Sequence, residues 1–149
     1  YDLFMSERIH LAIYFIYDII FERRDTDLNW NIEFYATKNG NEPVTQFLNS
    51  LSSKHRAKAI WEIDLLEKHG LSMKMPYVKN IQGEKYKGLM ELRVQQGNDI
   101  SRIFYFLPLN NTFVLLHGFI KKDWKTPRKE LETALRYKED YIRRFGIND

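Results

Sequence analysis

Residues 89–120 of this 149-residue chain, LMELRVQQGNDISRIFYFLPLNNTFVLLHGFI, decide its fold. Three runs rich in β-branched and aromatic residues, 89–95, 100–107 and 112–120, are separated by the short polar sequences QGND and NN. Runs of this length and composition, bounded by turn-forming residues, are typical of β-strands. Gly97-Asn98 and Asn110-Asn111 both suit two-residue hairpin turns. The stretch therefore predicts a three-stranded antiparallel meander.

The segments around the meander predict one further strand and three helices, which complete one α+β domain over residues 31–149. Residues 31–37 alternate as a strand does and end at the turn sequence KNGN. Pro43 suits a first helical turn, and apolar residues recur at helical spacing in 44–51, 53–69 and 126–145. Residues 73–88 contain Pro76 and two glycines and predict an irregular connection. The expected sheet is small, twisted and antiparallel, and consists of the first strand and the meander.

Residues 1–30 differ from the rest of the chain. Isoleucine and alanine recur at helical spacing between Ile9 and Ile20, which predicts an additional N-terminal helix. The apolar run 9–21 is interrupted by His10 and Asp18 and is too short to span a membrane. The segment also lacks the basic leader and the small-residue cleavage site of a signal peptide. We therefore expect a cytoplasmic protein without membrane contact.

The two hairpin turns fix the register of the meander by counting. Arg93 is expected opposite Arg102, Glu91 opposite Phe104, and across the second hairpin Arg102 faces Phe119 and Phe104 faces His117. Because side chains alternate between the faces of a sheet, the two faces can be written out. The expected core face carries Met90, Leu92, Val94, Ser101, Ile103, Tyr105, Leu107, Val114, Leu116, Gly118 and Ile120. The other face carries Glu91, Arg93, Arg102, Phe104, His117, Phe119 and Lys121, and it is the candidate functional face.

The chemistry of this second face suits an anionic partner. Two arginines directly opposite each other repel, and arginine beside an exposed aromatic ring suits phosphate clamping and base stacking. His117 is the one group of the face that titrates near neutral pH. Lys121, Lys122 and Lys125 add positive charge after the last strand. The alternative interpretation is a solvated sheet face on which Glu91 neutralises part of the positive charge. Elsewhere in the chain, we expect the Lys54-His55-Arg56 cluster to lie at the surface.

Composition limits the classes of function. The net charge of +3 permits nucleic-acid binding without requiring it. The absence of cysteine excludes disulfides, thiol nucleophiles and cysteine zinc sites. The four histidines show no metal-ligand spacing, and no glycine-rich phosphate loop is present. We therefore expect no metal and no cofactor.

Several short sequences in the right order resemble the HigB-type toxins of the RelE/ParE superfamily and their phage relatives. They are GNEPV (40–44), LMELR (89–93), SRIFY (101–105), VLLHGFIKK (114–122) and TP (126–127). The resemblance extends over residues 31–145, whereas residues 1–30 depart from the family pattern. It implies a RelE-like fold and the toxin component of a type II toxin–antitoxin system. Such a toxin cleaves mRNA without a metal, often on the ribosome, and forms a hetero-oligomer with a helix-turn-helix (HigA-like) antitoxin.

The resemblance and the derived face together give the candidate residues. The catalytic candidates are Glu91, Arg93, Arg102, His117 and Lys121, and the RNA-binding candidates are Lys79, Phe104, Phe119, Lys122 and Lys125. His117, with Glu91 as second choice, would remove the proton of a 2′-hydroxyl, and the arginines would stabilise the charge on the phosphate. Lys121 or Lys122 would protonate the leaving oxygen or hold the backbone.

Two other functions stay open at the level of the sequence. A toxin like the ParE branch would poison DNA gyrase and leave RNA intact. A phage-derived binding module would bind nucleic acid in a salt-sensitive way without causing growth arrest.

Overall fold

The computed structural model describes residues 9, 11–13, 16, 30–109 and 111–147. In chain order the elements are β1 (Asn31–Phe34), α2 (Pro43–Ser50), α3 (Ser53–His69), β2 (Val78–Asn80), β3 (Met90–Gln96), β4 (Asp99–Leu109), β5 (Thr112–Ile120) and α4 (Arg128–Phe145). Short 3₁₀ turns cover Gly70–Ser72 and Glu84–Tyr86. The predicted α+β class is confirmed, and the predicted helices begin and end within about two residues of α2, α3 and α4.

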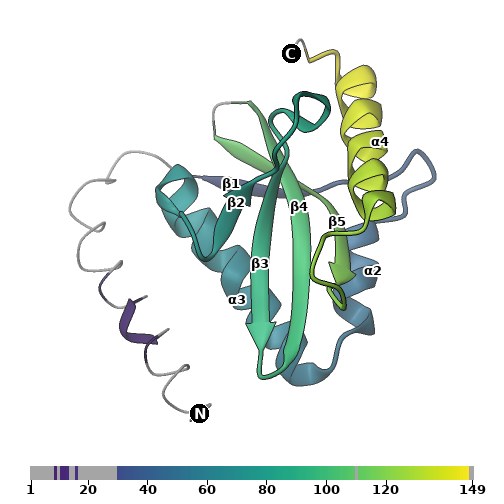
Figure 1. Cartoon of the computed structure of the whole chain (residues 1–149). Coiled ribbons are helices and arrows are strands. Elements are labelled where there is room, and N and C mark those ends of the chain that lie inside the picture. The colour runs from purple at the N-terminus through teal and green to yellow at the C-terminus, as the bar shows by residue number, and fades with distance from the viewer. Residues whose placement is uncertain (1–8, 10, 14–15, 17–29, 110, 148–149) are drawn as a thin grey trace.

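The sheet has five strands in the order β1-β5-β4-β3-β2 (Figure 1). β3, β4 and β5 form the predicted antiparallel meander. β1 pairs with β5 in parallel, so the sheet is mixed and not purely antiparallel as expected. β2 pairs with the outer edge of β3 and lies within the stretch expected to be irregular. The three residues of β2 are too few to show an alternating pattern, so this strand was not predicted. Alternation in β1 predicts a strand but does not show whether it runs parallel or antiparallel to its neighbour.

The predicted register holds through the first part of the meander. Arg93 lies opposite Arg102 and Glu91 opposite Phe104, whereas Arg102 faces Phe119 and Phe104 faces His117. The next pair is Tyr105 with Leu115, so Leu116 is an additional residue that makes a β-bulge in β5.

The bulge reverses the alternation at one end of β5. Val114 and Leu116, which were expected on the same face as Ile103, instead pack with Phe104 and Phe119 on the opposite face. Counting from the turn could not detect an additional residue inside the strand. Ile120, also expected in the core, is exposed at the end of β5.

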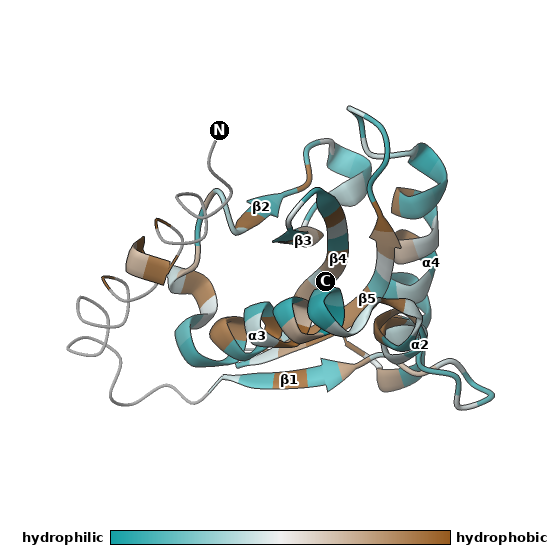
Figure 2. Cartoon of the chain, turned by 90° about the horizontal axis from the view of Figure 1, so that it is seen from below, coloured by the Kyte–Doolittle hydropathy of each residue, from teal (hydrophilic) through white to brown (hydrophobic). Residues whose placement is uncertain are grey.

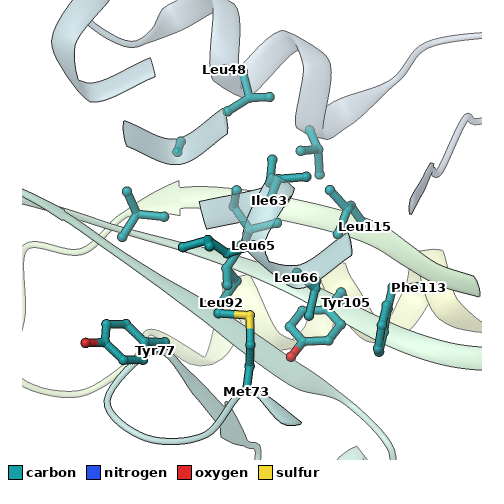
Figure 3. Packing of buried hydrophobic residues seen from close by; sticks show 14 of the residues in the cluster. Leu48, Ile63, Leu65, Leu66, Met73, Tyr77, Leu92, Tyr105, Phe113 and Leu115 are labelled. Atoms are coloured by element: carbon teal, nitrogen blue, oxygen red, sulfur yellow. The ribbon is translucent and has the colours of Figure 1, made fainter. Parts of the chain in front are cut away.

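Two hydrophobic cores lie on the two faces of the sheet. The first is between the sheet and helices α2 and α3, and Figure 3 shows Leu66, Leu92, Tyr105 and Leu115 among its members. The second lies under α4, whose surface is mostly hydrophilic in Figure 2. It contains Leu89, Phe104, Phe106, Val114, Leu116, Phe119, Ala134 and Tyr141. The face that the sequence assigned to function is therefore partly covered by the terminal helix.

Two glycines allow elements to approach closely. A Cβ on Gly118 of β5 would lie 2.3 Å from the ring of Phe47 on α2, so only glycine lets this helix pack so near the strand. Gly70 ends α3 with a φ of +54°, and a Cβ there would meet the indole of Trp30. Trp30 in turn stacks on Phe113 with ring centroids 5.1 Å apart. These contacts attach α2, α3 and β1 to the sheet.

Most of the predicted N-terminal helix lies outside the described residues. Those that are described, 9, 11–13 and 16, are helical. Ile13 packs against the first core, whereas Ile9, Leu11 and Ile16 are exposed. Within the part of the chain that the structure describes, no helix is both long enough and apolar enough to cross a membrane.

Candidate functional site

Three strands and the residue that follows β5 contribute cations to one region of the sheet. Arg93 of β3 lies directly opposite Arg102 of β4, and Lys79 of β2 lies opposite Glu91 of β3. Lys121 follows β5 and donates its backbone N–H to Ile100 of β4. Its pKa is lowered, first by burial and then by the positive charge of Arg102, with Arg93 and Lys79 adding to the effect. The predicted residues Lys79, Arg93, Arg102 and Lys121 thus form one cation cluster around Glu91.

Glu91 holds the two arginines together. It is 4% exposed, and its Oε1 lies 3.8 Å from Arg102 Nε and 4.0 Å from Arg93 Nε. These distances permit charge attraction but are too long for hydrogen bonds. Within the described chain, both Nε atoms and Glu91 Oε2 are buried without a hydrogen-bond partner. The two guanidinium groups therefore keep N–H donors that are not used by the fold.

The cations differ in their access to solvent. Arg102 is 5% exposed and donates through Nη1 to the carbonyl of Ser101 at 2.9 Å. Burial, together with the charge of Arg93, lowers its pKa, although a guanidinium stays protonated. The side chain of Arg93 is 29% exposed, and Lys79 is exposed. Arg102 thus lies beneath the cluster, and Arg93, Lys79 and Lys121 form its accessible edge.

A small pocket adjoins the arginine pair where β2 no longer covers the edge of β3. Its volume is about 160 Å³, and Arg93, Arg102, Lys58 and Tyr77 are among its lining residues. The loop before β2 forms one wall, and the backbone N–H of Arg93 donates to the carbonyl of Tyr77 at 2.8 Å. The two arginines are therefore paired across β3 and β4, and both line the pocket.

His117 lies on the same face, near the cation cluster. Its cross-strand partner is Phe104, and the cross-strand partner of Arg102 is Phe119. His117 and Arg102 are thus diagonal neighbours, a relation that places their Cβ atoms roughly 7–8 Å apart. His117 Nε2 is hydrogen-bonded to Glu130 Oε2 in the first turn of α4. When Glu130 accepts a hydrogen bond from Nε2–H, Nδ1 is left as the acceptor of the ring.

Glu130 was not predicted as a site residue. It could be recognised in the sequence only as an acidic residue in the first turn of a helix, where it interacts favourably with the helix dipole. The contact between α4 and β5 that brings it to His117 depends on how the terminal helix packs on the sheet, which no local pattern encodes.

Phe104 and Phe119 are not available for base stacking. Phe104 is fully buried and Phe119 is 6% exposed, with ring centroids 5.4 Å apart in the second core. The prediction that these rings stack on RNA is wrong, because α4 covers this end of the face. Alternation assigned the rings to the correct side of the sheet but could not show which helix packs on that side.

The loop between β5 and α4 contains the other predicted RNA-binding residues. Lys122 and Lys125 are exposed there, next to Lys121 of the cation cluster. The same loop carries Trp124, which is 94% exposed and which no sequence pattern singled out. Among the described residues, no group of three His, Asp or Glu side chains converges as metal ligands would.

The Lys54-His55-Arg56 cluster has a structural role and is not simply surface. His55 is buried, and its Nε2 lies 2.9 Å from Ser101 Oγ. Arg56 donates to the carbonyls of Leu48, Asn49 and Leu51 at the end of α2. The expectation that this cluster lies at the surface is therefore wrong for His55.

Comparison with known proteins identifies a family. The model of the family described as phage derived protein Gp49-like (DUF891) matches residues 46–139. No curated protein matches the chain. The matched region extends from α2 into α4 and includes every candidate residue named above. The family is associated with the toxins of toxin–antitoxin systems. Because the match covers more than half of the sequence, this chain belongs to the Gp49-like family of phage-derived proteins.

Proposed function

We propose that this protein is the toxin of a type II toxin–antitoxin system and that it cleaves mRNA by a metal-independent reaction. The observation that carries the proposal is the arginine pair, in which the partly exposed Arg93 lies opposite the buried Arg102, with Lys79 and Lys121 beside them. Guanidinium donors of this kind match the oxygens of a phosphate. The association of the family with toxins supports the same conclusion.

The proposed reaction is the attack of a ribose 2′-hydroxyl on the adjacent phosphate. A bond forms between O2′ and phosphorus, and the bond from phosphorus to the 5′ oxygen of the next nucleotide breaks. A 2′,3′-cyclic phosphate and a 5′-hydroxyl end result. Negative charge accumulates on the phosphate oxygens in the transition state, where Arg93, supported by the field of Arg102, stabilises it.

Two protons move in this reaction, and two residues suit their transfer. His117 Nδ1 accepts the proton of the 2′-hydroxyl, since Nε2 is bonded to Glu130. Lys121 donates a proton to the leaving 5′ oxygen, and its lowered pKa makes it a better acid than an ordinary lysine. Glu91, the second choice as base, is poorly suited because its carboxylate is buried between two arginines.

The proposed biological setting follows from the substrate. Translated mRNA is single-stranded in the ribosome, and a patch with many positioning cations and few acid–base groups suits a substrate that the ribosome orients. We expect a cytoplasmic protein that is neutralised by a helix-turn-helix antitoxin in a hetero-oligomer.

The proposal is tested with purified protein in a reconstituted translation reaction, with mRNA 5′ ends mapped by primer extension. Arg93→Ala is expected to lower the rate of cleavage about 100-fold, as for loss of one transition-state donor. The control is Arg143→Ala, which removes an exposed arginine from α4 that pairs with Asp140. Equal cleavage by wild type and Arg93→Ala would contradict the assigned site. Intact mRNA with every variant would contradict the nuclease function.

A further inference from the structure

Trp124 has an unusual environment for a tryptophan. It lies in the loop that joins β5 to α4 and is 94% exposed, the highest value among the exposed large hydrophobic residues of the described chain. Tryptophan is highly buried on average, because its ring has a large apolar surface. Exposure of the whole indole costs solvation free energy that a bound partner would recover.

The charge around Trp124 indicates the chemistry of that partner. Its sequence neighbours Lys122 and Lys125 are exposed, and Lys121 belongs to the cation cluster with Arg93 and Arg102. Residues 121–129 contain five cationic side chains and one acid, Asp123. The loop thus combines an accessible aromatic ring with positive charge that continues from the arginine pair.

We propose that Trp124 stacks on a nucleobase of single-stranded RNA whose backbone is held by Arg93 and Lys121. The inference rests on the proposed function and assigns the base-stacking role to a residue other than the buried Phe104 and Phe119. An aromatic ring beside a basic groove is the general device of single-strand binding, because every base offers a face for stacking.

A protein partner fits the same residue less well. Protein interfaces place tryptophan at the centre of a desolvated apolar patch. Trp124 is flanked in sequence by Lys122, Asp123, Lys125 and Thr126, which are polar. A ring flanked in sequence by lysines is better matched to a base on a phosphate backbone.

The experiment measures binding of a fluorescein-labelled 12-nucleotide oligouridine with 2′-O-methyl groups, which lacks the attacking hydroxyl. Fluorescence anisotropy gives the dissociation constant for wild type, Trp124→Ala and Trp124→Phe. Trp124→Ala is expected to weaken binding about ten-fold, and Trp124→Phe less, since a smaller ring still stacks. The salt dependence should be the same for wild type and Trp124→Ala, because no charge changes.

Two controls isolate the stacking contact. Trp61→Phe removes a tryptophan on α3 that contacts Lys58, and we expect it to leave the affinity unchanged. In the Trp61→Phe protein the emission comes from Trp124 and the buried Trp30, and the oligonucleotide should quench only the part that Trp124 contributes. Thermal unfolding of Trp124→Ala should match wild type, because the indole makes little contact with the fold.

The outcomes separate this inference from the proposed function. If Trp124→Ala binds the oligonucleotide as tightly as wild type, the stacking role is overturned and a protein surface becomes the better assignment. Wild-type protein that cleaves mRNA in the translation reaction but does not bind the oligonucleotide also overturns it, while the proposed function stands. If wild type neither binds nor cleaves, both are overturned.

Discussion

At the scale of single residues, Glu91 makes the arginine pair possible. Two guanidinium groups that face each other across strands repel, and Arg102 is also almost fully buried. The carboxylate of Glu91 is within 4.0 Å of both, which offsets repulsion without using their hydrogen-bond donors. The fold therefore keeps two positive charges at close range.

This role of Glu91 predicts a loss of stability in Glu91→Gln. The substitution removes the negative charge but keeps the shape, so Arg102 is left as an uncompensated buried charge. We expect the free energy of unfolding to fall by about 2 kcal/mol, measured by urea denaturation. Glu67→Gln, an exposed position on α3, serves as the control and should change it by less than about 0.5 kcal/mol. Equal stability of Glu91→Gln and wild type would contradict this account.

The burial of His55 leads us to expect that the free energy of unfolding depends on pH. Burial lowers the pKa of His55 below its usual value of 6.5 in the folded protein. The unfolded chain therefore binds a proton more readily, so stability is fully present above about pH 6.5 and falls as the pH decreases toward the folded pKa. The midpoint of thermal unfolding should decrease between pH 7.5 and pH 5 less for His55→Gln than for wild type. The same decrease in both proteins would show that His55 does not contribute.

At the scale of elements, the packing of α4 divides the face that the meander presents. One end lies beneath the helix as the second core, and the other end carries the cation cluster. A hydrogen bond between His117 and Glu130 joins a side chain of β5 to α4. The terminal helix is therefore both the cover of the core and the source of a residue that positions His117.

This contact predicts that Glu130→Gln lowers the rate of RNA cleavage. Glutamine can hydrogen-bond to the imidazole but no longer favours the tautomer with Nε2 protonated as strongly. We expect kcat to fall at least ten-fold with little change in the affinity for the 2′-O-methyl oligonucleotide. Glu139→Gln, on the exposed side of the same helix, should have wild-type activity. An unchanged kcat for Glu130→Gln would remove Glu130 from the proposed mechanism.

Local sequence determined some elements and left others open. Hairpin register was predictable because turn residues such as Gly97 and Asn98 fix the loop length, and every later pair follows by counting. The bulge at Leu116 was not predictable, because an additional apolar residue in an apolar strand does not change the composition of that strand. The parallel direction of β1 and the existence of β2 depend on the path of the chain through α2 and α3.

At the scale of the whole molecule, the sequence predicted the cations of the candidate site better than its aromatic residues. Arg93, Arg102 and Lys121 come together because register alone determines their positions. Phe104 and Phe119 were assigned to solvent because the packing of α4 is a long-range property. Trp124 was missed for the opposite reason, because residues in an irregular loop have no periodicity from which exposure can be predicted.

The proposed nuclease cleaves translated mRNA with the help of the arginine pair. The most direct measurement is induced expression in a bacterial host, with transcript 5′ ends mapped for wild type, Arg93→Ala and the control Arg143→Ala. We expect new ends carrying a 5′-hydroxyl inside translated regions with wild type and Arg143→Ala, and their absence with Arg93→Ala. Growth arrest with intact transcripts would contradict it and favour a gyrase-poisoning toxin. Neither arrest nor new ends would favour a binding module.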